Sequence, residues 1–284
     1  MILQKRRKQL LSRKQMSNFW QRSITGVAYV AVLLGMTFYH PVSLGILFLT
    51  MTIIGCNEFY TIAIKGDNLP QKIMGIIVAS SAFILSFLTV FYDLPSKFMA
   101  LIIPLICIVF IGELYRKKSN PFRQIAFALL GIIWVGLPMS LIPFLVGVKS
   151  GFHPELLAGC FYLVWANDTG AYLLGRKLGK NKLFERISPK KTWEGAAGGA
   201  ILALALSYPI AQYYTIISFA DWVILAAITV LTGNYGDLVE SLYKRSKNIK
   251  DSGTLLPGHG GILDRIDSLL MVIPFVFVYL YLTV

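Results

Sequence analysis

The chain has 284 residues, of which 56% are hydrophobic and 14% charged, and its mean hydropathy is +0.64. Soluble domains usually carry about a quarter charged residues, so this composition excludes an ordinary soluble protein. The formal net charge of +13 is not the footprint of a nucleic-acid-binding protein, because we expect no soluble domain to present it. The three cysteines lie in apolar segments and indicate neither a zinc site nor disulfides.

Apolar stretches of about 20 residues, long enough to cross a bilayer as helices, recur along the whole chain. A backbone in lipid must satisfy its own hydrogen bonds, which favours helices. We predict an all-α, polytopic integral membrane bundle of about nine transmembrane helices. The predicted spans are 19–39, 41–57, 72–92, 97–115, 124–148, 154–175, 193–214, 217–236 and 266–283.

The basic residues predict the orientation of these spans. With the N-terminus in the cytoplasm, all 27 Lys and Arg residues except Lys97 and Lys149 lie on the cytoplasmic side, counting those at the adjoining span ends. An odd number of spans then puts the C-terminus on the opposite side. The basic run at residues 5–8 and the apolar stretch after it are read as a retained signal-anchor.

This topology predicts three regions. Residues 1–18 form a basic cytoplasmic tail, and 19–150 form about five N-terminal transmembrane helices with few polar groups. Residues 151–284 form a C-terminal catalytic region of about four spans, whose cytoplasmic loops are 176–192 and 237–265. These two loops are the longest, and they are rich in polar residues and glycine. Function is therefore expected in the C-terminal half.

Carboxylates near the last two spans are spaced to hold a hard cation. Four residues share one helical face by their i, i+3, i+4 and i+7 spacing: Asp237, Glu240, Ser241 and Lys244. Asp264 and Asp267 likewise share a face at the start of the last span. Carboxylates at a membrane helix end can bind Mg²⁺, which bridges protein oxygens to substrate phosphates.

The same loops carry groups that suit phosphate. Glycines in the second loop would let backbone N–H groups approach an anion: Gly258, Gly260 and Gly261. Basic side chains would neutralise its charge: Lys190, Lys191, Lys244, Arg245 and Lys250. Asp168 lies inside a predicted span, where a charge costs about 2.5–3.5 kcal/mol, so it should face the bundle interior with a partner or a role.

Simpler interpretations remain open for each of these residues. Asp264 or Asp267 could cap a helix, and Glu240 with Lys244 could be an ordinary i,i+4 ion pair. The lysine loops could be orientation signals or contacts to anionic lipid, and His259 could be a hydrogen-bonding loop residue. The four-residue spacing of Gly195 and Gly199 indicates close helix packing.

Residues 241–267 resemble the signature of phosphatidate cytidylyltransferases (CDP-diacylglycerol synthases). Its fixed positions here are Ser241, Lys244-Arg245, Lys250-Asp251, Gly253, His259-Gly260-Gly261 and Asp264-Arg265-Ile266-Asp267. Tyr243 departs from the aliphatic residue or Phe usual in the family. The 188–192 and 167–170 segments are also similar to family features, and the resemblance covers roughly 160–284.

The resemblance implies transfer of CMP from CTP to phosphatidic acid, giving CDP-diacylglycerol and pyrophosphate in phospholipid biosynthesis. It implies Mg²⁺, accompanied by a monovalent cation such as K⁺, on Asp237 and Asp264, with Glu240 and Asp267 as further candidate ligands. The implied catalytic residues are Asp237, Asp264, Lys244, Arg245, Lys250 and Asp251. The implied substrate-binding residues are Asp168, Ser188, Lys190, Lys191, Ser241, His259, Gly260, Gly261 and Arg265. A homodimer in a bacterial-type inner membrane is expected, with the site facing the cytoplasm.

Two other functions compete with this one. A cytidylyltransferase acting on an isoprenoid or ether lipid phosphate would need the same loops, because apolar spans do not distinguish acyl from isoprenoid chains. A transporter of an anionic solute would account for many spans and for Asp168. Transporters, however, place binding groups near the midplane in broken helices, whereas the polar residues here cluster on one side.

Overall fold

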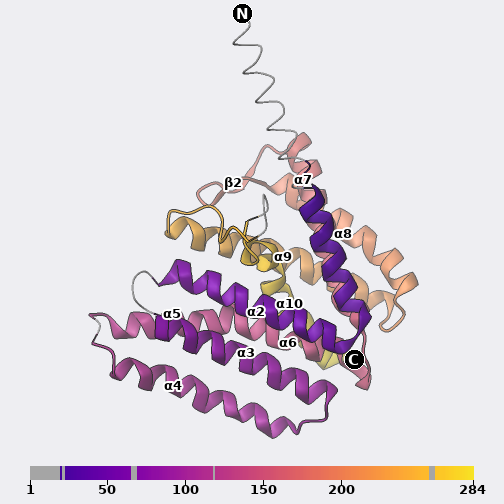
Figure 1. The fold of residues 1–284 in the computed structure, drawn as a ribbon. Helices are drawn as coiled ribbons and strands as arrows, with labels where there is room; N and C mark the ends of the chain where they lie inside the picture. The colour runs from indigo at the N-terminus through magenta and orange to yellow at the C-terminus, as the bar shows by residue number, and fades with distance from the viewer. Residues whose placement is uncertain (1–19, 21–22, 65–68, 118, 256–259) are drawn as a thin grey trace, which may run out of the picture.

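The computed structural model describes residues 20, 23–64, 69–117, 119–255 and 260–284. Within them the chain folds into membrane-type helices and one short hairpin (Figure 1). After an N-terminal helix, Ser23–Tyr39, come α2 (Pro41–Ala63), α3 (Leu69–Phe91), η1 (Ser96–Leu101), α4 (Ile102–Leu114), α5 (Pro121–Gly131), η2 (Ile132–Gly136), α6 (Leu137–Val146) and η3 (Val148–Ser150). The second half comprises α7 (Pro154–Leu178), β1 (Lys182–Phe184), β2 (Ser188–Thr192), α8 (Trp193–Tyr213), α9 (Phe219–Ser246) and α10 (Leu263–Thr283).

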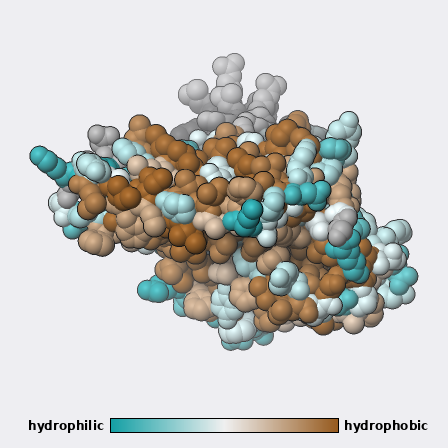
Figure 2. Space-filling view, turned by 90° about the horizontal axis from the view of Figure 1, so that it is seen from below, coloured by the Kyte–Doolittle hydropathy of each residue, from teal (hydrophilic) through white to brown (hydrophobic). Residues whose placement is uncertain are grey.

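The predicted polytopic helical fold is confirmed. Of the helices that the structure describes, seven are long and apolar enough to cross a membrane. The helix Ser23–Tyr39 is apolar but shorter, and α7 carries charged residues along its length. Hydrophobic side chains dominate the face seen from below (Figure 2), as expected for a surface that contacts acyl chains.

Helix ends differ from the predicted spans where polar residues continue the helix. α9 runs to Ser246 instead of 236, and α10 begins at Leu263 instead of 266. The fifth span is α5 and α6 joined by the π-helical turn η2. Pro138, just after this turn, has no N–H to bond the carbonyl four residues earlier, which explains the locally wider turn. The hairpin β1–β2 within the 176–192 loop was not predicted.

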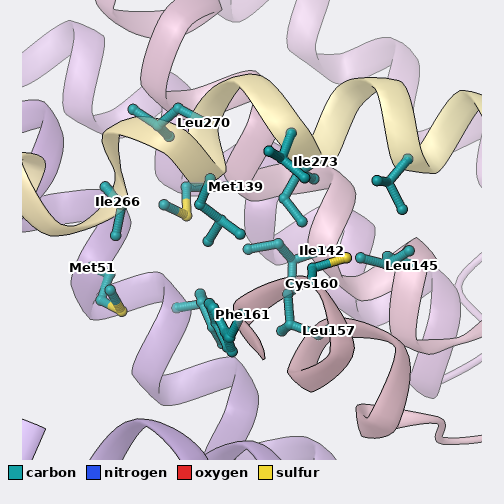
Figure 3. Close-up of a cluster of buried hydrophobic side chains, with 14 of the residues drawn as sticks. Met51, Met139, Ile142, Leu145, Leu157, Cys160, Phe161, Ile266, Leu270 and Ile273 are labelled. Carbon is teal, nitrogen blue, oxygen red and sulfur yellow. The ribbon is translucent and has the colours of Figure 1, made fainter. Parts of the chain in front are cut away.

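The core of the bundle lies where α2, α6, α7 and α10 meet. Figure 3 shows Met51 from α2, Ile142 from α6, Phe161 from α7 and Ile273 from α10 converging on one another. These side chains are almost completely buried. They pack closely against one another, as side chains in protein interiors do. The N-terminal half is thereby joined to α10, which carries Asp264 and Asp267.

Glycines allow α7 and α8 to pack unusually closely, as the spacing of Gly195 and Gly199 predicted. A Cβ at Gly199 would lie 2.4 Å from the Asn167 side-chain oxygen, and one at Gly195 would lie 2.9 Å from the Ala171 carbonyl oxygen. Small residues at such positions let backbones approach in membrane proteins. This contact fixes the place of Asp168, one residue beyond Asn167, beside the hairpin that precedes α8.

Candidate functional site

Two adjacent helices bring three carboxylates together. Asp237 and Glu240 lie on α9 and Asp267 lies on α10, and their ligand oxygens are all within 4.8 Å of one another. The helices approach closely here because a Cβ at Gly236 would lie only 2.7 Å from the Asp267 carbonyl oxygen. Glycine therefore sets the distance between the two halves of the acidic cluster.

Glu240 is the most buried member of this cluster, with a fully buried side chain. Its Oε2 pairs with Lys244 at 2.5 Å, while its Oε1 has no hydrogen-bond partner within the part of the chain that the structure describes. A buried acceptor without a donor is rare in folded proteins. A hard cation, which prefers carboxylate oxygen, would satisfy it. Asp237 is 35% exposed, so the cluster opens outward on that side.

Lys244 connects this cluster to a second carboxylate on α10. Its Nζ lies 2.5 Å from Glu240 and 2.6 Å from Asp264, and its side chain is only 11% exposed. The i,i+4 pair that was one interpretation of the sequence is therefore present, but as half of a bridge between two helices. A buried ammonium group needs such partners because desolvation of a charge is costly.

Asp264 is held by protein donors at both oxygens. Its Oδ1 accepts from Lys244 at 2.6 Å, and its Oδ2 accepts from the Ser252 and Gly261 backbone N–H groups, both at 2.8 Å, and is 3.0 Å from the Ser252 hydroxyl. Gly260 has a φ of 83°, a conformation that favours glycine. Asp264 thus joins Ser252 to Gly261, nine residues later in the chain.

The hairpin β1–β2 brings a lysine to the cluster from the other loop. Lys191 on β2 forms an ion pair with Asp237 and lies 3.5 Å from the Asn234 carbonyl oxygen. The next residue, Thr192, is the N-cap of α8, and its side chain accepts from the Gly195 N–H. A cap of this kind fixes the register of strand and helix together.

Asp168 lies between two cavities that differ in character. One, of about 240 Å³, is bordered by the N-terminal helix, α7 and α10, and its wall includes Tyr29, Trp165 and Arg265. The other, of about 200 Å³, lies under the hairpin and α8, and its wall includes Lys191. Asp168 lines both. The wall of the first cavity combines aromatic and aliphatic side chains with the carboxylates of Asp264 and Asp267, whereas Lys190 and Lys191 border the second.

A family model described as "Cytidylyltransferase family" matches residues 20–283 of the chain. The chain belongs to this family. It is similar to proteins named phosphatidate cytidylyltransferase from Haemophilus influenzae (42% identity over 58% of this chain and 59% of the relative) and Staphylococcus aureus (43% over 56% and 60%). It is also similar to the one so named from Staphylococcus saprophyticus (44% over 56% and 60%). The matched regions span about three fifths of the length of these relatives.

Several predicted site residues of this cytidylyltransferase-family protein gather around the acidic cluster. Ser241 lies 3.3 Å from Asp237 through its hydroxyl, and Lys190 and Arg265 border the two cavities. Ser188 begins β2 in the same hairpin as Lys191. These placements leave the individual roles as predictions.

Other predicted residues point elsewhere or fall outside the described residues. Arg245 is exposed and donates to the Ile249 carbonyl oxygen at 3.2 Å. Lys250 and Asp251 are exposed, and Asp251 lies beside Gly260, whose added Cβ would be 3.7 Å from the Asp251 Cβ. His259 belongs to the 256–259 segment, which lies outside the described residues.

Three residues at or near the site were not predicted from the sequence. Asn234 accepts a hydrogen bond from Asn167 at 3.4 Å and borders the cavity that Lys190 and Lys191 line. Glu58 and Ser252 contact the segment around Asp264. In the sequence, Glu58 is a charged residue directly after a predicted span. Ordinary residues of membrane-protein loops occur at the same kind of position, so this feature does not single it out.

Proposed function

We propose that this protein is a CTP:phosphatidate cytidylyltransferase, which transfers CMP from CTP to phosphatidic acid. One observation carries the proposal: three clustered carboxylates, flanked by Lys191 and Lys244, lie beside two cavities that share Asp168, one bordered by two lysines and the other by aromatic side chains and Asp267. The relatives named phosphatidate cytidylyltransferase support it independently.

The reaction requires charge neutralisation and positioning. A phosphatidate oxygen forms a bond to the α-phosphorus of CTP, and the bond from that phosphorus to the bridging oxygen of the β-phosphate breaks, releasing pyrophosphate. The attacking phosphate monoester has a second pKa of about 6, so it is already largely ionised at neutral pH and needs no general base. Two anions must instead be brought together, which is achieved by fixed cations and alignment.

The acidic cluster fits Mg²⁺, because it supplies hard oxygen donors and includes a buried oxygen without a donor at Glu240. Asp237, Glu240 and Asp267 would hold the ion, accompanied by a monovalent cation such as K⁺. When bound, Mg²⁺ offsets the negative charge of the substrate phosphates. The ligand role of Asp264 stays a prediction; its Oδ1 already accepts from Lys244, and its Oδ2 accepts from Ser252 and Gly261.

The two cavities suit the two substrates. The cavity bordered by Lys190 and Lys191 would receive the triphosphate, whose charge these lysines neutralise. The cavity bordered by Tyr29 and Trp165 would receive the lipid phosphate, with its acyl chains still in the bilayer. The distribution of basic residues supports a site facing the cytoplasm of a bacterial cell. We propose a homodimer as the working form.

The test is a turnover assay with the purified full chain in detergent, CTP, phosphatidate and Mg²⁺, followed by pyrophosphate release and mass spectrometry of the lipid. We expect CDP-diacylglycerol in stoichiometric yield with pyrophosphate. Isoprenoid phosphate and ether-lipid phosphate, each supplied in place of phosphatidate, should react more slowly. A faster reaction with either would reassign the lipid, and no pyrophosphate with any of the three would reject nucleotidyl transfer.

A further inference from the structure

Glu58 on α2 is a buried carboxylate that the reaction outlined above does not use. Its side chain is among the buried charged groups, at 8% exposure. Burying a carboxylate is costly unless it is hydrogen-bonded. The hydrogen bonds that Glu58 accepts come from Ser252, Ile262 and Leu263, about 200 residues later in the chain. They join the N-terminal half to the start of α10.

Glu58 supplies a cap that the sequence of α10 lacks. The N-cap residue of α10 is Ile262, whose side chain makes no capping hydrogen bond. Glu58 Oε1 instead accepts from the Ile262 N–H at 3.1 Å, and Oε2 accepts from the Leu263 N–H at 2.9 Å. The first N–H groups of a helix have no intrahelical partner and favour a negative charge. The carboxylate therefore fixes where α10 begins.

Ser252 links Glu58 to Asp264. Its hydroxyl lies 2.9 Å from Glu58 Oε2 and 3.0 Å from Asp264 Oδ2. Two glycines make room for this contact: an added Cβ would lie 2.6 Å from Glu58 Oε1 at Gly253, and 2.3 Å from Glu58 Oε2 at Gly261. A larger residue at either position would displace the carboxylate.

The same end of α2 also holds the end of α9. The Tyr243 hydroxyl donates to the Phe59 carbonyl oxygen at 2.8 Å, and Lys247 Nζ donates to the Ala63 carbonyl oxygen at 3.0 Å. α9 carries Asp237 and Glu240, and α10 carries Asp267. The last turns of α2 thus contact both helices that form the acidic cluster.

We infer that Glu58 is a positioning residue for the acidic cluster: by fixing the start of α10, it sets the placement of Asp264 and Asp267. The inference rests on the proposed function, because the acidic cluster is taken as the metal site of the transferase. Loss of a residue that orients metal ligands in this way typically lowers metal affinity or activity by about 10–100-fold.

The decisive variant is Glu58→Gln, which keeps the size of the side chain but removes the charge and presents an NH₂ group to a backbone N–H. Mn²⁺ binding to the full-length protein in detergent, followed by electron paramagnetic resonance, should weaken about 10-fold, and kcat should fall about 10–100-fold. The Mg²⁺ concentration for half-maximal rate should rise in parallel. Glu58→Asp, which keeps the charge on a shorter side chain, should recover part of the Mn²⁺ affinity.

Glu155→Gln is the matched control, because it removes a partly buried carboxylate in the first turn of α7, whose partner is the N-cap residue His153. It should leave Mn²⁺ affinity and kcat unchanged. Ser252→Ala should weaken Mn²⁺ binding as Glu58→Gln does, and the double variant should be little worse than the single ones, because the two residues act as one unit.

Wild-type Mn²⁺ affinity and Mg²⁺ dependence in Glu58→Gln would overturn the inference. So would a loss of activity that only follows the amount of folded protein, with Mn²⁺ affinity unchanged. If Glu58→Gln does not fold, Ser252→Ala decides by the same two measurements. A wild-type protein that binds Mn²⁺ but makes no CDP-diacylglycerol would reject the proposed function, and the Mn²⁺ comparison would still test Glu58.

Discussion

Lys244 on α9 and Asp264 on α10 form an ion pair at 2.6 Å, across the contact between the last two helices. Lys244 also pairs with Glu240, so one ammonium group serves a carboxylate of the acidic cluster and a carboxylate that orders the neighbouring loop. The acidic cluster and the loop are therefore coupled through the buried ammonium group of Lys244.

Lys244→Met should destabilise the protein, because it leaves two buried carboxylates without their cation. Removing one partner of a buried ion pair typically costs about 3–5 kcal/mol, so we expect a clear fall in the melting temperature in detergent and loss of turnover. Lys97→Met, on an exposed residue, is the stability control and should melt like the wild type. An unchanged melting temperature in Lys244→Met would show that the bridge contributes little.

Asp237→Asn and Asp264→Asn should have different effects: the first should weaken metal binding, and the second should lower stability. Asp237 is partly exposed and belongs to the acidic cluster, so Asp237→Asn should weaken Mn²⁺ binding by about 10-fold or more, at an unchanged melting temperature. Asp264→Asn should lower the melting temperature, because it loses the charge that pairs with Lys244. Loss of Mn²⁺ binding in Asp264→Asn without any loss of stability would instead assign Asp264 as a metal ligand.

The sequence predicted most of the fold because spans are defined by composition alone. Apolar runs of sufficient length have few alternatives in a bilayer, and each predicted span overlaps a helix of the structure. The ends were less accurate, since α9 continues for ten residues beyond the predicted end at 236. In these ten residues Glu240 and Lys244 form an ion pair. A search for apolar stretches does not detect a helix that polar pairs continue.

The site was predictable only where its residues are close in sequence. The i,i+3 spacing of Asp237 and Glu240 predicted a shared face, and both belong to the acidic cluster. The contacts of Glu58 could not be predicted, because its partners are about 200 residues away in the sequence and no local pattern indicates such a contact. The different surroundings of Asp264 and Asp267 could not be predicted either, since both share one helical face and only donors from other segments distinguish them.

Gly170→Ala should destabilise the α7–α8 contact. A Cβ at Gly170 would lie 2.4 Å from the Gly198 carbonyl oxygen, which is backbone and cannot move aside easily. Overpacking of this kind typically costs about 1–3 kcal/mol. Gly35→Ala is the matched control, because nothing lies within 4 Å of its added Cβ. Thermal unfolding in detergent should show a loss for Gly170→Ala alone, and equal melting temperatures would contradict the close contact.

Val30→Trp should interfere with the lipid and spare the nucleotide. Val30, on the N-terminal helix, borders the cavity that Tyr29 and Trp165 line, so a larger ring would fill space assigned to phosphatidate. We expect the KM for phosphatidate to rise about 10-fold, the effect of roughly 1.4 kcal/mol of lost binding, with the KM for CTP unchanged. Val27→Trp, at a position of the same helix that is 70% exposed, should behave like the wild type. A rise in the KM for CTP in Val30→Trp would instead place the nucleotide in this cavity and reverse the proposed assignment of the two substrates.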